Sequence, residues 1–430
     1  MSDIAKKSVE NFAVRIALQV VSIGGAIIIA RTLGASGKGV FTFATTLLTT
    51  LQMANAGQAS AIAWQYTQRG RSPAALFRAM FTILSGFALP IVVGLALAGI
   101  FIHGQWTLIA VAVALPFALF NQASNGFFLA DSNVRSLNIQ QIVLSALPAA
   151  IYVPLLLFAH APLGALLALW AFGYVAAGLY TLWALRRYPA MRKGDDGANI
   201  AKEQLGYGAQ VSLNTAVSYL NWRVDVFIIM LMLGQSALGV YSIGVGIGEM
   251  LWFLSRAINY ASFGRIARGS EPEAAETTAT CMRHSFALVM IGAILVFFLA
   301  PPLVPLVYGK AFAEAGIVAR YLLPGMVAYS MMPTLATFFS QQLGQPRLPL
   351  LFSTGSLLIC GVVTVLTLPH FGIIGGAIAT SVSYIAAFSV AVIFFVRRTR
   401  IAPLKLFRLT RSDLLPYRSL LPNKINSYGS

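Results

Sequence analysis

Twelve apolar stretches decide what this chain can fold into. Each has about 20 residues or more, which is enough to cross a hydrocarbon core of about 30 Å as an α-helix. The stretches lie near 12–33, 40–64, 80–102, 107–130, 138–160, 161–185, 209–233, 237–263, 284–308, 313–341, 349–369 and 373–396. The composition agrees, because 58% of the 430 residues are hydrophobic and only 10% are charged. We therefore predict an all-α polytopic membrane protein with about twelve transmembrane helices.

Basic residues are distributed unevenly between the two sets of loops that these spans define. If the N-terminus is cytoplasmic, the loops and tail on that side carry 23 Lys and Arg residues, whereas the opposite loops carry only Arg31, Lys38 and Lys310. Hydropathy alone defined the spans, so the charge bias supports them independently. The sequence thus predicts a multi-pass protein with both termini in the cytoplasm and a first span that is retained.

A basic cytoplasmic tail is predicted at 398–430. It mixes Leu and Phe with Arg and Lys, so part of it either lies on the inner leaflet or is disordered. The net charge of +17 comes from this tail and from short loops beside helix ends. Orientation and anionic lipid headgroups explain such a distribution, and a nucleic-acid partner is not expected.

One nine-residue phrase occurs twice, 200 positions apart, as LGASGKGVF at 33–41 and LGQSALGVY at 233–241. Each copy separates two apolar stretches. Six spans per half is an even number, so the halves point the same way and their pseudo-symmetry axis lies along the membrane normal. We predict two parallel six-helix lobes around a central cavity, at 1–185 and 209–397, joined by a cytoplasmic linker at 186–208.

The repeat also shows which charged residues the fold does not require. At an offset of 200 residues, charged positions of the second half align with uncharged ones of the first: Arg223 with Ile23, Asp225 with Gly25, Glu249 with Thr49 and Arg256 with Ala56. An ionisable residue near the bilayer centre costs roughly 2.5–3.5 kcal/mol on insertion scales, so such residues usually face a polar interior. They either form a structural ion pair between the seventh and eighth spans or serve function.

Polar residues recur at helical spacing in four spans. The sets are Asn11, Arg15, Gln19 and Ser22; Asn121, Gln122 and Asn125; Asn214, Ser218, Asn221 and Asp225; and Glu249, Trp252, Arg256 and Asn259. Polar contacts between membrane helices could explain any one of them. Four together favour a hydrated cavity.

These features resemble a known family, the Wzx-type polysaccharide and O-antigen flippases of the multidrug/oligosaccharidyl-lipid/polysaccharide exporter superfamily. The similar motifs are ARTLGASGKGVF, NWRVDVFIIMLMLG, GVYSIGVGIGEMLWF, PLVYGKAF, YLLPGM and LGQPR. Each is loose, but their order extends over almost the whole chain. The resemblance implies a bacterial inner-membrane flippase that moves undecaprenyl-diphosphate-linked oligosaccharide from the cytoplasmic to the periplasmic leaflet by alternating access, for surface polysaccharide biosynthesis.

The resemblance gives the polar residues candidate roles. Arginine binds phosphate bidentately and stays protonated, so Arg15, Arg223 and Arg256 are candidates for the diphosphate; Arg320 is equally a helix-end anchor. The glycan would meet Asn11, Asn121, Gln122, Asn125, Asn214, Tyr219, Asn221, Trp252 and Asn259. Asp225 and Glu249 could couple transport to an ion gradient. The expected partners are the polyprenyl-diphosphate-linked glycan and membrane lipids, with a polysaccharide polymerase and glycosyltransferases as further candidates.

Two other classes of protein compete with this interpretation. A multidrug cation antiporter of the same superfamily would favour a negative cavity, whereas the spans hold four Arg against Asp225 and Glu249. A membrane enzyme acting on lipid-linked glycans would need positioned acids or histidines. His103, His160 and His370 lie in short predicted loops, and the sequence contains no Gly-rich phosphate loop, HExxH motif or metal-binding cluster. We therefore expect no enzyme activity, cofactor or metal.

Overall fold

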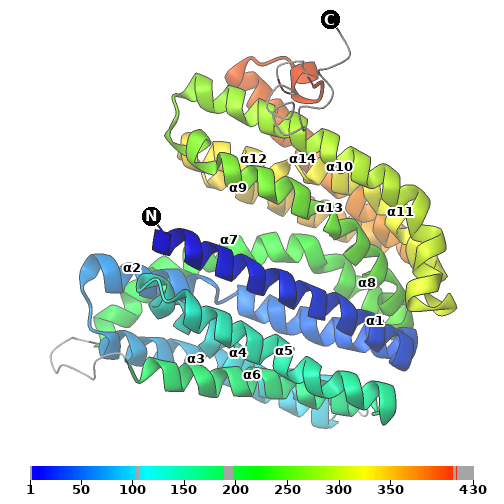
Figure 1. The fold of residues 1–430 in the computed structure, drawn as a ribbon. Coiled ribbons are helices and arrows are strands. Elements are labelled where there is room, and N and C mark those ends of the chain that lie inside the picture. Colours follow the sequence, from blue (N-terminus) through cyan, green and yellow to red (C-terminus); the bar gives the residue numbers. More distant parts are fainter. Residues whose placement is uncertain (1, 102–105, 188–196, 410–412, 414–430) are drawn as a thin grey trace, which may run out of the picture. The chain divides into compact units, whose positions relative to one another are not determined.

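The fold is built from long helices. The computed structural model describes residues 2–101, 106–187, 197–409 and 413 (Figure 1), and the regular elements of this part of the chain are all helical. They are α1 (Ser2–Met53), α2 (Gly57–Arg69), α3 (Pro73–Phe101), α4 (Trp106–Ala130), α5 (Val134–Phe158), α6 (Leu163–Leu185), α7 (Gly197–Met232), α8 (Gly234–Met250), α9 (Trp252–Arg268), α10 (Glu271–Tyr308), η1 (Lys310–Phe312), α11 (Ala313–Tyr329), α12 (Met332–Thr337), the π-helical η2 (Phe338–Gln342), α13 (Arg347–Phe371), α14 (Ile373–Thr399) and η3 (Pro403–Leu406).

Eleven helical stretches of the described chain are long and apolar enough to cross a membrane. The first of them, Ala13–Arg69, has 57 residues, whereas one crossing needs about 20. It is interrupted at Gly34, whose φ of 66° and ψ of −169° are not helical, and again by a turn at 54–56. This stretch therefore contains the first two predicted spans, and the predicted all-α polytopic membrane fold with about twelve spans is confirmed.

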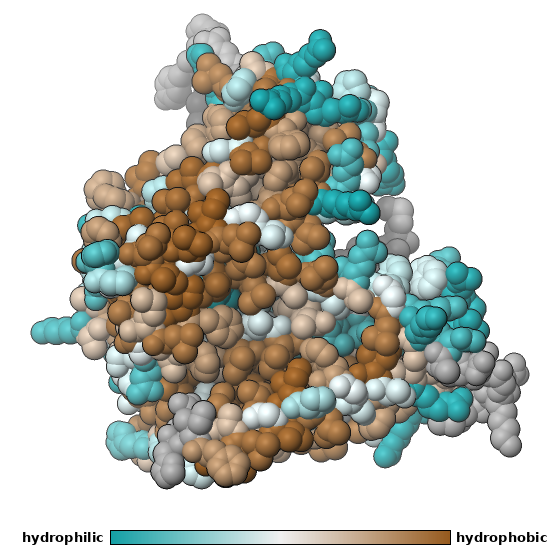
Figure 2. Space-filling model, turned by 180° about the vertical axis from the view of Figure 1, so that it is seen from behind, coloured by the Kyte–Doolittle hydropathy of each residue, from teal (hydrophilic) through white to brown (hydrophobic). Residues whose placement is uncertain are grey.

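The outer surface suits a lipid environment. Figure 2 shows one face of the molecule covered largely by hydrophobic side chains, with hydrophilic side chains gathered towards its margins. Large apolar residues such as Phe158 and Leu231 are 83% and 84% exposed. A water-soluble protein rarely leaves so continuous an apolar surface uncovered.

The chain forms two compact units. The first comprises Met1–Ser242 and Val307–Ala311, and the second comprises Ile243–Leu306 and Phe312–Ser430. By its contacts, α7 belongs with the helices that precede it, and the boundary falls within α8. The end of α10 belongs to the first unit, where the Arg31 Nε donates a 2.7 Å hydrogen bond to the Val307 carbonyl. The predicted lobes at 1–185 and 209–397 rest on the internal repeat and stay a prediction.

In the first unit, α4 is the central helix. It packs against α1, α2, α3 and α6, and its residues Leu115, Leu119 and Phe127 are almost fully buried. In the second unit, α11 and α14 pack closely together. Ser381 of α14 joins them, because its hydroxyl donates to the Tyr321 carbonyl at 2.6 Å and accepts from the Gly325 amide at 3.3 Å.

The two copies of the repeated phrase meet inside the first unit. A Cβ atom on Gly39 would overlap the Gln235 carbonyl, and a Cβ atom on Gly239 would overlap the Ala35 carbonyl. The two contacts are equivalent, because Gly239 and Gln235 are the counterparts of Gly39 and Ala35 in the repeat. The two helices therefore cross about a local two-fold axis. Glycine at both positions lets the backbones approach this closely.

A polar contact on the same axis continues the symmetry. The Thr42 hydroxyl donates to the Ser242 hydroxyl at 3.3 Å, and these residues are also 200 positions apart. The turn that begins each copy is shared as well, since Gly34 and Gly234 have positive φ values of 66° and 84°. Both features follow from two halves that share one backbone geometry at this point.

Candidate functional site

The predicted polar stripe of α7 runs from the surface into the first unit. Asn214 is exposed, Ser218 is half-buried, and Asn221 and Asp225 are buried. The 3.6-residue period of the helix keeps these residues on one face. The stripe therefore ends at a buried carboxylate.

Asp225 is hydrogen-bonded on both carboxylate oxygens. The Tyr241 hydroxyl donates to one of them, and the Val226 backbone amide donates to the other at 2.8 Å. Asp225 is 3% exposed, and Tyr241 is fully buried. A carboxylate in a membrane span needs such donors, because burying it without them is costly.

Sequence reasoning missed Tyr241, although the repeat contained a signal. At the offset that aligns Asp225 with Gly25, Tyr241 aligns with Phe41. The second half thus has an acid where the first half has none, and gains an aromatic hydroxyl that binds it.

Arg223 and Arg15 are the first unit's candidates for binding an anion. Arg223 is half-buried, its guanidinium carbon lies 6.0 Å from the centre of the Tyr219 ring, and its Nη1 donates to the Trp222 carbonyl at 3.3 Å. Arg15 is an exposed residue of α1. The side chain of Asn11 lies outside the described residues.

Asn121 belongs to a hydrogen-bonded network that joins three helices. Its Nδ2 donates to the Tyr174 carbonyl at 3.3 Å, and its Oδ1 accepts from the Thr181 hydroxyl at 3.0 Å. Gln140 of α5 donates to Thr181 at 2.8 Å. Both ends of the Asn121 amide are thus engaged between α4 and α6, as in polar contacts that hold membrane helices together.

The neighbouring amides of α4 differ from Asn121. Gln122 and Asn125 are half-buried, and their amide oxygens have no hydrogen-bond partner among the described residues. A buried amide oxygen of this kind can accept from a ligand hydroxyl. Gln122 and Asn125 thus differ from Asn121, because each has an acceptor that no described residue uses.

In the second unit, Trp252 lies in an aromatic cluster. Its ring is 5.5 Å from that of Tyr329 and 6.1 Å from that of Tyr384, and these tyrosines stack on each other at 4.3 Å. All three residues are buried. The sequence singled out Trp252 alone, because Tyr329 and Tyr384 come from α11 and α14, far along the chain.

The other second-unit candidates lie along α8 and α9. Glu249 is half-buried near the end of α8, and Arg256 is exposed on α9. Asn259 accepts a hydrogen bond from the Thr337 hydroxyl at 3.2 Å, which joins α9 to α12. The predicted site residues are thus divided between the units, with Arg15, Arg223 and Asp225 in the first and Glu249, Trp252 and Arg256 in the second.

These features, long apolar helices that carry a few arginines, acids and amides, define a class of protein: a polytopic membrane protein. Residues 4–270 match the family described as polysaccharide biosynthesis protein. Because that segment is more than half of the chain, the protein belongs to this family, as its motifs predicted. A probable low-salt glycan biosynthesis flippase of Haloferax volcanii, Agl15, is 24% identical over 206 residues. The match covers 47% of this chain but only 43% of that protein.

Solved structures share the fold. The lipid II flippase MurJ in an inward closed conformation is similar with a TM-score of 0.75 and 12% identity, covering 93% of this chain and 89% of MurJ. An inward-facing multidrug resistance MATE family transporter of the MOP superfamily has a TM-score of 0.67 and 14% identity, covering 89% of this chain and 94% of the transporter. At such identities the likeness concerns the fold alone. This chain therefore shares the fold of these two transporters.

Proposed function

We propose that this protein moves an undecaprenyl-diphosphate-linked oligosaccharide from the cytoplasmic to the periplasmic leaflet by alternating access. Membership of the polysaccharide biosynthesis family supports a glycan cargo, and so does the partial match to a probable glycan flippase. The protein would lie in a bacterial inner membrane with both termini in the cytoplasm. A polysaccharide polymerase and glycosyltransferases would be its partners in the same pathway.

The charge balance of the spans is the observation that carries this proposal. Arg15, Arg223, Arg256 and Arg320 lie within predicted spans, and the acids there are Asp225, Glu249 and Glu314, the last in the first turn of its helix. Asp225 already accepts hydrogen bonds from Tyr241 and from its own backbone, which reduces the negative charge available to a ligand. An excess of arginine suits a diphosphate better than an organic cation.

Arg320 is better interpreted as an anchor than as a ligand. Its Nε donates a 2.7 Å hydrogen bond to the Phe297 carbonyl, and its guanidinium lies 4.6 Å from the Phe297 ring centre. It therefore holds α11 to α10 within the second unit. This makes Arg320 a matched control for the arginines proposed to bind diphosphate.

The polar side chains of the spans would bind the sugars and a coupling ion. Gln122 and Asn125 have amide oxygens that can accept from glycan hydroxyls, and Trp252 or Tyr219 can stack on a sugar ring. Asp225 and Glu249 are both candidates for ion coupling. Asn11, Asn121, Asn214, Asn221 and Asn259 stay as further candidates for the glycan lining.

Reconstitution in vesicles tests the proposal. The full chain should move a labelled undecaprenyl-diphosphate oligosaccharide across the bilayer, and Arg223→Gln should slow this by about 10- to 100-fold, because a hydrogen bond to a charged group contributes roughly 1.5–3 kcal/mol. Arg320→Gln, at equal protein density, should keep the wild-type rate. Transport of organic cations without any movement of the lipid-linked glycan would overturn the proposal in favour of the multidrug antiporter.

A further inference from the structure

The segment that follows α14 is ordered and has two different faces. Its inner face packs on the second unit: Leu406 is fully buried, and the Phe407 ring lies 5.3 Å from Phe286 of α10 and 6.2 Å from Phe388 of α14. Asp413, further along, is 6% exposed. Residues 401–409 are therefore docked on the helices, which the sequence left undecided.

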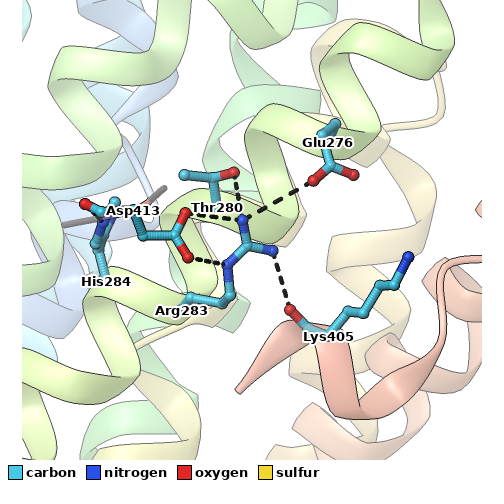
Figure 3. Close-up of polar contacts among 6 residues, drawn as sticks. All are labelled: Glu276, Thr280, Arg283, His284, Lys405 and Asp413. Carbon is cyan, nitrogen blue, oxygen red and sulfur yellow. Dashed lines mark hydrogen bonds and ion pairs between the residues drawn. The ribbon is translucent and has the colours of Figure 1, made fainter. Parts of the chain in front are cut away.

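A buried arginine holds this segment in place (Figure 3). Arg283 of α10 binds Asp413 bidentately at 2.9 and 3.0 Å, and also donates to the Lys405 carbonyl at 3.0 Å and the Thr280 hydroxyl at 2.9 Å. The side chains of Arg283 and Asp413 are only 7% and 5% exposed. Buried bidentate pairs fix geometry, because separating them leaves a buried charge without its partner.

A second ion pair joins α14 to α10. Arg398, at the end of α14, binds Glu271, at the start of α10, at 2.7 and 3.0 Å. The ends of α10 and α14 and the segment after α14 thus form one clamped assembly within the second unit. Its outward face is set by these contacts.

That outward face combines basic and apolar side chains. Arg400, Lys405 and Arg408 are exposed, and the adjacent Leu404 and Leu409 are 69% and 37% exposed. Figure 3 shows the Lys405 ammonium pointing away from the Arg283 clamp, although its carbonyl is bound there. Exposed leucines beside lysine and arginine are typical of segments that lie at a membrane surface.

We propose that this outward face, residues 400–409, binds the anionic phospholipid headgroups of the leaflet in which α14 ends. The segment begins one residue after Thr399, the end of a candidate membrane span, so covalent continuity keeps it at headgroup depth. Basic residues beside a span end are attracted to anionic lipids, and the two leucines can enter the interface. Docking by Arg283 orders the segment in advance, so that little entropy is lost on binding.

A polarity-sensitive dye on Leu404→Cys would measure the contact. The native Cys281 and Cys360 are buried, so labelling should be selective, and unsubstituted protein gives the background. In nanodiscs of phosphatidylcholine with phosphatidylglycerol the dye should report a less polar environment than in phosphatidylcholine alone, and high salt should reverse this.

Substitution of the basic residues in the segment is the decisive part of the experiment. Each basic residue near an anionic surface is expected to contribute about fivefold, so Lys405→Gln/Arg408→Gln should lower the ratio of bound to unbound segment roughly 25-fold. The control Lys202→Gln/Arg347→Gln removes two exposed charges elsewhere and should leave the ratio unchanged. Asp413→Asn should also lower it, because it weakens the clamp.

Three results would overturn the proposal. The first is a dye signal that is the same in both lipid mixtures. The second is a signal that Lys405→Gln/Arg408→Gln does not change. The third is a signal that appears only when an acidic protein is added. The dye reports the environment of residues 400–409 and not transport. Failure of the proposed flippase activity would therefore leave this proposal unaffected.

Discussion

The two copies of the repeated phrase have similar backbones but different surroundings. Each has a glycine with positive φ in its turn and a glycine at the crossing of the two helices. The first copy is preceded by Gly25 and ends in Phe41, whereas the second is preceded by Asp225 and ends in Tyr241. Asp225 and Tyr241 are hydrogen-bonded to each other. The geometry is thus common to both halves, and the buried acid–hydroxyl pair is specific to the second.

The difference between the two copies distinguishes residues that the fold requires from residues that are available for function. A crossing that both copies share must fit in both, so it constrains residue size and little else. An acid–hydroxyl pair that one copy lacks is not needed for that crossing. Substitutions at the shared glycines should therefore cost most, those at the unshared pair less, and those at the hydroxyls on the two-fold axis least.

Gly239→Ala should have the largest effect. The added Cβ would overlap the Ala35 carbonyl, and because backbone cannot move aside easily, the cost should reach about 3 kcal/mol, the upper end for overpacking. Gly246→Ala, in the same helix, is the matched control, since nothing lies within 4 Å of its added Cβ. That change should be neutral or stabilising by up to about 1 kcal/mol, from helix propensity.

Thermal unfolding in detergent would compare the two variants. Because Gly39 and Gly239 contact each other's helices reciprocally, Gly39→Ala should be as harmful as Gly239→Ala. The double variant should cost less than the sum, since one displacement of the helices relieves both overlaps. Equal stability of Gly239→Ala and Gly246→Ala would refute the close crossing.

The sequence predicts the helices well because the bilayer sets their length. It also indicates the shared turn, through the glycines of the repeated phrase. It does not distinguish Asn121, which joins helices, from Gln122 and Asn125, whose amide oxygens have no partner in the described part of the chain. Asparagine and glutamine have the same hydropathy in either role, and only the neighbouring helices decide between them.

Tyr241→Phe should have an intermediate effect, and it restores the aromatic residue of the first copy. It removes a hydroxyl that donates to the buried Asp225 carboxylate, which should cost about 2 kcal/mol, because a buried acceptor loses a donor. Tyr260→Phe, at an 80% exposed position, should change stability very little.

A double-mutant cycle sharpens this comparison. If the pair forms one unit, Tyr241→Phe should cost much less when Asp225→Ala is already present, since the carboxylate that needs the donor is gone. Stability would be measured by thermal unfolding in detergent for all four proteins. Strictly additive losses would mean that Asp225 and Tyr241 act separately.

Ser242→Ala should have the smallest effect, because it removes one long hydrogen bond between two neutral hydroxyls. The Thr42 hydroxyl would lose the acceptor of its proton at 3.3 Å, whereas the 2.9 Å hydrogen bond that it accepts from the Lys38 ammonium would stay. Hydrogen bonds between membrane helices average about 0.6 kcal/mol, so unfolding should shift by roughly that amount, against no shift for the exposed Ser236→Ala. A loss above about 2 kcal/mol would place the stability of the crossing in its hydroxyls and not in the close approach of its glycines.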